Sequence, residues 1–296
     1  MQNRSLRAIL ATALGLLLSS ATALGEGSNS SVGPQYDTTH VYVPAESFDR
    51  FVASFVATFG GKTTPKGTFT LTPTASKTMS QLAITPSGTI SVFGFLTPIP
   101  FPFGVEHYGY LVANFDSAIA TARSDGASVT VAPYNDPVGR DVIMQWPGGL
   151  TLQLYQHTTP PNYPAVRYVP EDRVYVSPDS ADAFIRSFVA FSQGRIASDV
   201  ASAPGIEIGR PSEIYRRVEI ESGFANVRVI ITDGHLPYPY GREVTGYAVG
   251  NVAAALRKAM SAGATVLVQP FTSSGRISSM VQFPGGYVAE IHSAAQ

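Results

Sequence analysis

Two histidines are the side chains of this 296-residue chain whose type and spacing best suit chemistry. His40 lies in the alternating run THVYV and His107 begins the run HYGYLV, so each is predicted to lie on a β-strand. Two imidazoles, one oxygen donor and open water positions can hold Zn²⁺, Ni²⁺, Fe²⁺ or Mn²⁺. The alternative is a pair of hydrogen-bonded histidines that line a pocket without a metal. Both interpretations require a fold that brings the two strands together.

An internal repeat indicates such a fold. Residues 105–130 are matched by residues 242–267 at a shift of 137 positions, and both copies begin with Glu-x-x-Gly-Tyr. Each copy predicts a short strand, a turn at Asn114 or Asn251, a helix, a glycine stop and a new strand. The second copy has Val244 where the first has His107, so the chemistry of the site is predicted to differ between the copies.

The repeat extends over most of the chain. Three segments of the second half are similar to segments of the first: DRVYV at 172–176 to THVYV at 39–43, FPGG at 283–286 to WPGG at 146–149, and HLPYPYG at 235–241 to PIPFPFG at 98–104. A phenylalanine stripe at 47–59 predicts a helix, and strands are predicted at 67–71, 81–85, 89–96, 140–145 and 150–156. The pattern predicts a duplicated α+β fold in which four βαβββ units form two domains.

The N-terminus and the composition indicate export. Arg4 and Arg7 precede an apolar run at 8–18 and a small-residue segment, so residues 1–25 are predicted to be a secretory signal peptide. The alternative is an uncleaved N-terminal anchor; no other segment is long and apolar enough to span a membrane. Cleavage would change the formal net charge from −1 to −3, which argues against nucleic acid as a partner. We expect a periplasmic or secreted protein that folds without disulfides, because it has no cysteine.

The rest of the chain divides at two stretches of low complexity. Residues 26–36 are rich in Gly and Ser and are predicted to be a disordered leader. Residues 158–169 are rich in proline and are predicted to be a linker between domains at 37–157 and 170–296. The expected assembly is a monomer or a homodimer.

These features together resemble the vicinal oxygen chelate superfamily, which includes glyoxalases, bleomycin-resistance proteins and extradiol dioxygenases. The resemblance is carried by the paired βαβββ units, a strand that begins with His, the motif HxGYxV before a helix, and a last hairpin that reads PGGxxxE. It covers about residues 37–157 and 170–293. It implies two glyoxalase-like domains, each a curved mixed sheet around a cavity with flanking helices.

The resemblance also implies where ligands lie. The matched metal positions in the first half are His40, His107 and Gln153, with no acidic residue among them and no His, Asp or Glu at 89–96. In the second half the matched positions carry Arg173 and Glu290, with Val244 and Arg228 at the others. A guanidinium has no lone pair to donate, so this half is predicted to be metal-free. Glu290 is expected to pair with Arg173 or Arg228, or to frame an anion site.

Two functions from different classes follow. The first is a metal-dependent lyase, isomerase or dioxygenase that acts on an unknown small molecule in the first half. The alternative is a non-catalytic small-molecule binding protein, similar to the bleomycin-resistance branch, with a degenerate metal site and no cofactor. Because side chains alternate along strands, Tyr42 and Tyr155 are expected to share the cavity with His40 and Gln153. The candidate substrate-binding residues are therefore Tyr42, Tyr155, Arg173, Arg228 and Glu290.

Overall fold

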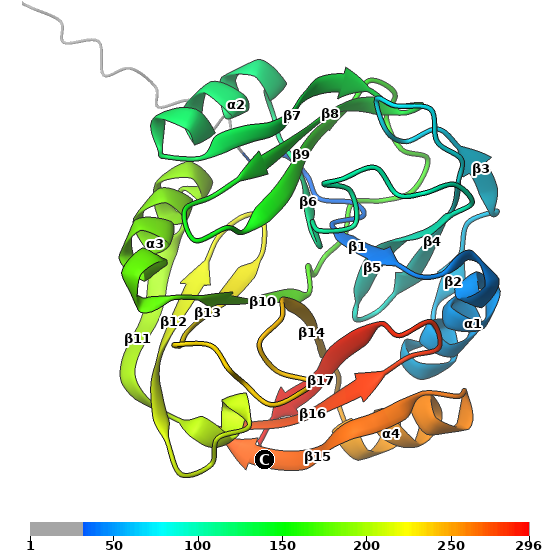
Figure 1. Cartoon of the computed structure of the whole chain (residues 1–296). Coiled ribbons are helices and arrows are strands. Elements are labelled where there is room, and N and C mark those ends of the chain that lie inside the picture. Colours follow the sequence, from blue (N-terminus) through cyan, green and yellow to red (C-terminus); the bar gives the residue numbers. More distant parts are fainter. Residues whose placement is uncertain (1–31, 296) are drawn as a thin grey trace, which may run out of the picture.

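The first half of the protein contains two successive units that each begin with a strand and a helix (Figure 1). The computed structural model describes residues 32–295, so the predicted signal peptide lies outside the described residues. The first unit comprises β1 (Thr39–Tyr42), η1 (Ala45–Ser47), α1 (Phe48–Phe59), β2 (Lys62–Thr63), β3 (Gly67–Phe69), β4 (Thr78–Thr85) and β5 (Gly88–Phe95). The second comprises β6 (Gly109–Leu111), α2 (Phe115–Ser124), β7 (Ser128–Asn135), β8 (Gly139–Gln145) and β9 (Thr151–His157).

The second half repeats the same order of elements. Its first unit comprises β10 (Glu171–Val176), α3 (Pro178–Ser192), β11 (Arg195–Pro204), η2 (Gly205–Ile208), β12 (Ile214–Glu221) and β13 (Asn226–Ile231). Its last unit comprises β14 (Val244–Ala248), α4 (Val252–Ser261), β15 (Thr265–Ser273), β16 (Arg276–Gln282) and β17 (Val288–Ala294). The α+β fold and the four units predicted from the sequence are confirmed. The strand predicted at 67–71 is present as the shorter β3, and the structure adds the short strand β2 before it. Pro65 lies between the two strands and has no N–H for a sheet hydrogen bond.

Strand order is the same in both halves. The second half forms one eight-stranded mixed sheet in the order β11-β12-β13-β10-β14-β17-β16-β15. The first half forms the corresponding sheets β1-β5-β4-β2 and β6-β9-β8-β7, which an antiparallel bridge between Thr39 and Tyr108 joins. At this junction the backbone N–H of His40 donates to the carbonyl of His107 at 2.8 Å. The fold therefore places the two histidines opposite each other. His40 lies on β1 as predicted, whereas His107 lies two residues before β6 and not on a strand.

The helix starts follow from the sequence. The side chain of Asn114 accepts a hydrogen bond from the backbone N–H of Ser117 at 3.0 Å, and Asn251 accepts one from Ala254 at 2.8 Å. Each asparagine thus satisfies one of the free N–H groups at the start of α2 or α4. No helix within residues 32–295 is long and apolar enough to cross a membrane.

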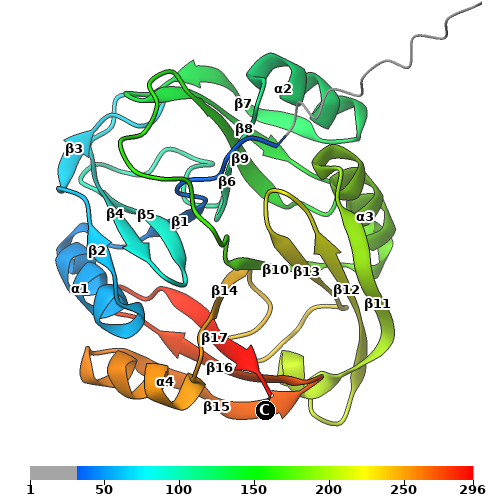
Figure 2. The same ribbon diagram turned by 180° about the vertical axis from the view of Figure 1, so that it is seen from behind.

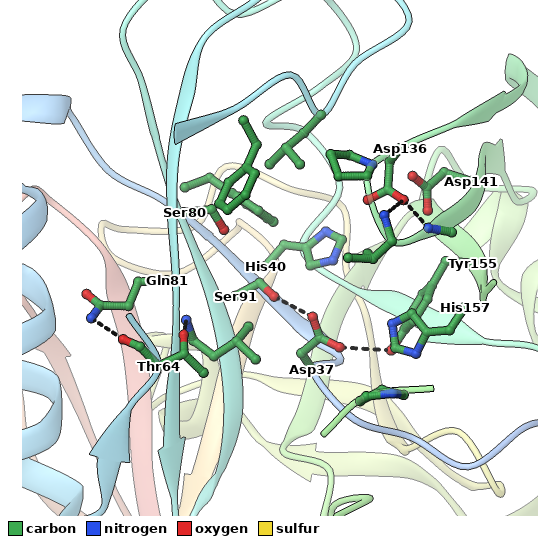
Figure 3. Close-up of a pocket in the computed structure, with 18 of the residues that line it drawn as sticks. Asp37, His40, Thr64, Ser80, Gln81, Ser91, Asp136, Asp141, Tyr155 and His157 are labelled. Carbon is green, nitrogen blue, oxygen red and sulfur yellow. Dashed lines mark hydrogen bonds between the residues drawn. The ribbon is translucent and has the colours of Figure 1, made fainter. Parts of the chain in front are cut away.

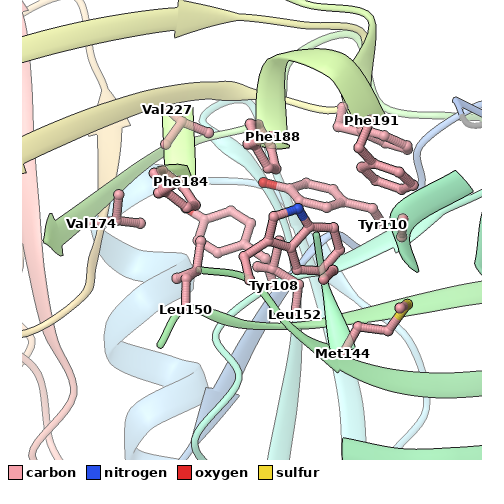
Figure 4. Close-up of a cluster of buried hydrophobic side chains, with 14 of the residues drawn as sticks. Tyr108, Tyr110, Met144, Leu150, Leu152, Val174, Phe184, Phe188, Phe191 and Val227 are labelled. Carbon is pink, nitrogen blue, oxygen red and sulfur yellow. The ribbon is translucent and has the colours of Figure 1, made fainter. Parts of the chain in front are cut away.

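The helices pack across the boundary between the halves (Figures 1 and 2). Helix α1 lies against α4, and α2 lies against α3, so each of the two larger hydrophobic cores contains one unit from each half. In one core the ring of Phe55 lies 5.2 Å from that of Tyr247. In the other, shown in Figure 4, Tyr110 of the first half lies among Phe184, Phe188 and Phe191 of the second. The two halves are therefore joined by shared cores and not by the linker alone.

The segments predicted to be a disordered leader and a linker flank the sheets of the first half. The N–H of Gly33 donates to the carbonyl of Leu111, and the amide of Gln35 bonds to both the carbonyl and the N–H of the same residue. Residues 32–36, which end the stretch predicted to be a disordered leader, thus lie along β6. Residues 158–170, which contain the predicted linker, form no helix or strand.

Candidate functional site

A cavity of about 390 Å³ lies inside the curved sheets of the first half (Figure 3). Its walls come from β1, β3, β4, β5, β8 and β9 and from the segment 159–163 that follows β9. The volume is that of a pocket for a small organic molecule. Aromatic side chains line much of it, including Tyr42, Phe69, Phe93, Phe95, Phe103 and Tyr155. The two tyrosines predicted to share this cavity both lie in it.

The segment 159–163 forms one wall of the cavity although it lies within the predicted linker. The ring of Tyr163 packs edge-on against Tyr36 with 5.8 Å between ring centroids. Nearby, the backbone N–H of Val166 donates to the carbonyl of Gln35 at 2.8 Å. The chain that connects the halves is thus fixed against the first residues of the described chain, and it encloses the site.

Hydrogen bonds hold the polar groups of the cavity in place. Asp37 accepts one from the hydroxyl of Ser91 at 2.8 Å and one from the hydroxyl of Tyr155 at 3.2 Å. Asp141 accepts one from Nε2 of Gln153 at 2.8 Å. Burial and the nearby charge of Asp136 raise the pKa of Asp141 well above its usual value, against the hydrogen bond from Gln153. The cavity therefore combines apolar walls with a few positioned polar groups.

His40 reaches the cavity from β1, with only 5% of its surface exposed. Its Nδ1 has no hydrogen-bond partner in the described part of the chain and lies 3.9 Å from Oε1 of Glu106. The same carboxylate oxygen accepts a hydrogen bond from the hydroxyl of Tyr42. Gly109 leaves room for the imidazole, because a Cβ there would lie 2.6 Å from Nε2 of His40. Glu106 thus supports two side chains of the cavity from behind.

His107 lies opposite His40 but is not among the residues that line the cavity. Burial, together with the nearby charges of His40 and Arg242, lowers the pKa of His107 to about 4 against the opposing effect of Glu106. The ring is therefore neutral near pH 7.

The metal implied by the resemblance does not fit the residues that the structure brings together. No group of three or more His, Cys, Asp or Glu side chains within residues 32–295 could hold a metal ion. Gln153 lines the cavity, but its amide nitrogen bonds to Asp141, and a neutral amide adds no charge to balance a divalent ion. His40, His107 and Gln153 remain a predicted donor set, and the structure does not complete it.

The second half has a network of charges at the equivalent place. Arg173 occupies the position that corresponds to His40, and its Nη1 lies 2.5 Å from the carboxylate of Glu290, as the sequence predicts. Four arginines and four glutamates, buried or half-buried, are linked by ion pairs: Arg173, Arg217, Arg228, Arg276, Glu171, Glu207, Glu219 and Glu290. Of the candidate residues, Arg173 and Glu290 therefore pair with each other, Arg228 joins the same network through Glu171 and Glu219, and none of the three lines the first-half cavity.

Solved structures with a similar chain path are a synthase, a dioxygenase and a glyoxalase. A mutant of 4-hydroxymandelate synthase from Streptomyces coelicolor superimposes with a TM-score of 0.57 at 12% identity, covering 89% of this chain and 94% of that chain. The 2,3-dioxygenase LapB from Pseudomonas sp. KL28 gives 0.54 at 12% identity, covering 90% and 94%. The Mn(II)-bound glyoxalase from Novosphingobium aromaticivorans gives 0.53 at 14% identity, covering 90% and 84%.

The chain has the vicinal oxygen chelate fold. This confirms the fold that the sequence motifs predict, over nearly all of the described chain. A comparison with protein-family models found no match, and a search of curated proteins found no similar sequence. The fold assignment therefore rests on structural similarity, and the chemistry must be argued from the site.

Sequence reasoning missed two polar groups of this site. Asp141 could have been found, because it lies opposite Tyr155 in the antiparallel pairing of β8 with β9 across the WPGG turn. Residues directly opposite in such a pair point to the same face of the sheet. Asp37 had no comparable signal, because it lies in an irregular segment before β1.

The charge network in the second half of this fold makes stability depend on pH. Burial alone would raise the pKa of Glu171, but the guanidinium groups of Arg228 and Arg276 lower it to about 2. The ordinary value is 4.5, so the ionised carboxylate stabilises the folded state above pH 4.5. This contribution is lost as the pH falls toward 2.

We expect the stability difference between the wild type and Glu171→Gln to be largest above pH 4.5 and to shrink as the pH falls to 2. Glutamine does not titrate, so the variant lacks the carboxylate at every pH. Urea unfolding at a series of pH values measures the difference. Glu46→Gln, at an exposed position in η1, is the control for the loss of a surface carboxylate. A difference that stays constant down to pH 2 would contradict the ion pairs of Glu171.

Proposed function

We propose that this glyoxalase/dioxygenase-like protein binds a small aromatic molecule in the cavity of its first half. The observation that carries the proposal is the cavity itself, whose aromatic walls surround Asp37, His40 and Gln153. Flat apolar walls suit an aromatic ring, and a few convergent polar groups fix its orientation. The names of two structures with this fold, 4-hydroxymandelate synthase and 2,2′,3-trihydroxybiphenyl 1,2-dioxygenase, refer to hydroxylated aromatic compounds. They suggest a phenol as the first probe.

We expect 4-ethylphenol to bind the wild type with a Kd in the range of about 10 µM to 1 mM, and Ser80→Phe to abolish the binding. Ser80 lines the cavity opposite Phe93 on the neighbouring strand, so a phenylalanine there occupies the space of the ligand ring. Isothermal titration calorimetry measures both affinities, and circular dichroism checks that the variant is folded. Ser128→Phe, at an exposed position on β7, is the matched control and should bind like the wild type. Unchanged binding by Ser80→Phe would place the ligand outside this cavity.

The second candidate function is a metal-dependent lyase, isomerase or dioxygenase. Only the position of His40 and Gln153 in the cavity favours it in this chain, because a bound metal would need further donors. Such a metal would supply a Lewis acid or activate oxygen. Metal analysis after reconstitution separates the two candidate functions. About one metal ion per chain supports the metal-dependent enzyme, whereas less than about 0.1 metal ion per chain supports only the binding function.

A further inference from the structure

We infer that the cavity of the first half selects cationic aromatic molecules over anionic ones. The inference rests on the proposed function and adds the charge of the ligand to it.

The charges that line the cavity have one sign. Asp37 and Asp136 line it, whereas no lysine or arginine within residues 32–295 does. Asp141 also lines it but is not counted among these charges, because burial raises its pKa well above the usual value. Asp37 is held by the hydroxyls of Ser91 and Tyr155, and Asp136 accepts hydrogen bonds from backbone N–H groups that follow it in the chain. Neutral donors fix the position of a carboxylate without cancelling its charge. A cation that enters the cavity therefore meets a negative potential.

The basic residues next to the cavity are paired outside it. Lys66 follows the lining residue Pro65, but its ammonium binds both carboxylate oxygens of Asp49 at 2.7 and 2.9 Å. Arg140 follows the lining residue Gly139, but its guanidinium pairs with Asp116 at 2.9 Å. It also lies 4.4 Å from the ring centre of Phe115. Both positive charges are thus directed away from the cavity and offer nothing to a ligand carboxylate.

One further feature favours a cation. The rings of Tyr42 and Phe93 lie 5.2 Å apart in the wall, and ring faces of this kind attract an ammonium group. The aspartates and the rings therefore favour the same ligand charge.

Three ligands that share a phenol ring test the inference. Tyramine carries an ammonium group, 4-ethylphenol is neutral and 3-(4-hydroxyphenyl)propionate carries a carboxylate. Calorimetric titrations of the wild type at neutral pH and low salt are expected to show tyramine binding at least about tenfold more tightly than 4-ethylphenol, and the propionate most weakly. Asp37→Asn should reduce the preference for tyramine over 4-ethylphenol, both measured on the same variant, to less than about threefold.

Asp179→Asn is the matched control, because it removes an exposed carboxylate of α3 in the second half and should keep the preference. If Asp37→Asn does not fold, Asp136→Asn takes its place. No binding of 4-ethylphenol would overturn the proposed function and this inference together. Binding of 4-ethylphenol without tighter binding of tyramine would overturn the charge preference alone. A tyramine preference that survives both aspartate substitutions would also overturn it, because the preference would then arise elsewhere.

Discussion

Glu290→Gln is expected to lower the free energy of unfolding by about 3–5 kcal/mol, because it leaves Arg173 as an unpaired buried charge. The side chain of Arg173 is only 2% exposed, and Glu290 is the one carboxylate that pairs with it in the described part of the chain. Glutamine keeps the volume and removes the charge, so packing changes little. Urea unfolding followed by circular dichroism measures the loss.

A double-mutant cycle tests whether the loss comes from the pair. Arg173→Met combined with Glu290→Gln should destabilise the protein by less than the sum of the single changes, since neither charge is then left alone. The control is Glu221→Gln, which breaks the exposed pair of Arg195 and Glu221 and should cost less than about 1 kcal/mol. A loss of less than about 1 kcal/mol for Glu290→Gln would show that Arg173 finds another counter-charge or water.

Residues 32–157 expressed alone are expected to lack a cooperative unfolding transition. The stripe of α1 that packs against α4 includes Phe51, Phe55 and Phe59, each at most 8% exposed in the whole chain. Exposing each such ring costs roughly 1.5–3 kcal/mol, and the loss of α3 exposes the face of α2 as well. Together these losses match the roughly 5–15 kcal/mol by which whole proteins are stable. Near-UV circular dichroism and thermal melts give the measurement.

The control keeps both halves and cuts the chain between them. Cleavage after the exposed Arg167 should leave a complex that melts as one unit, and co-expression of residues 158–295 should restore the fold of residues 32–157. A cooperative melt of the isolated first half, within a few degrees of the full chain, would contradict the shared cores.

The duplication, the helices and most strands could be predicted from the sequence because their signals are local. Asn114 and Asn251 begin helices, and alternating runs mark strands, whatever the rest of the chain does. The packing of α1 against α4 could not be predicted in this way. An apolar stripe shows that a helix buries one face, and it does not show which distant segment covers that face.

The site was predicted in part for a related reason. The resemblance and the alternation of side chains placed His40, Tyr42, Gln153 and Tyr155 in one cavity, and the structure does so. It does not bring His107 into that lining, and it gives Gln153 a partner, Asp141, that the motifs do not indicate. The residues that could donate to a metal must point to the same place. The direction of each side chain depends on the register between paired strands, and a sequence motif alone does not give that register.

The wall formed by 159–163 limits how the chain can vary in length. Surface connections between domains usually tolerate inserted residues, because extra loop length costs little free energy. Here the same residues connect the two halves and enclose the cavity, so an insertion beside Tyr163 changes the shape of the cavity while both cores stay intact. Homologous chains that share the ligand should therefore keep the length of this segment more strictly than its sequence.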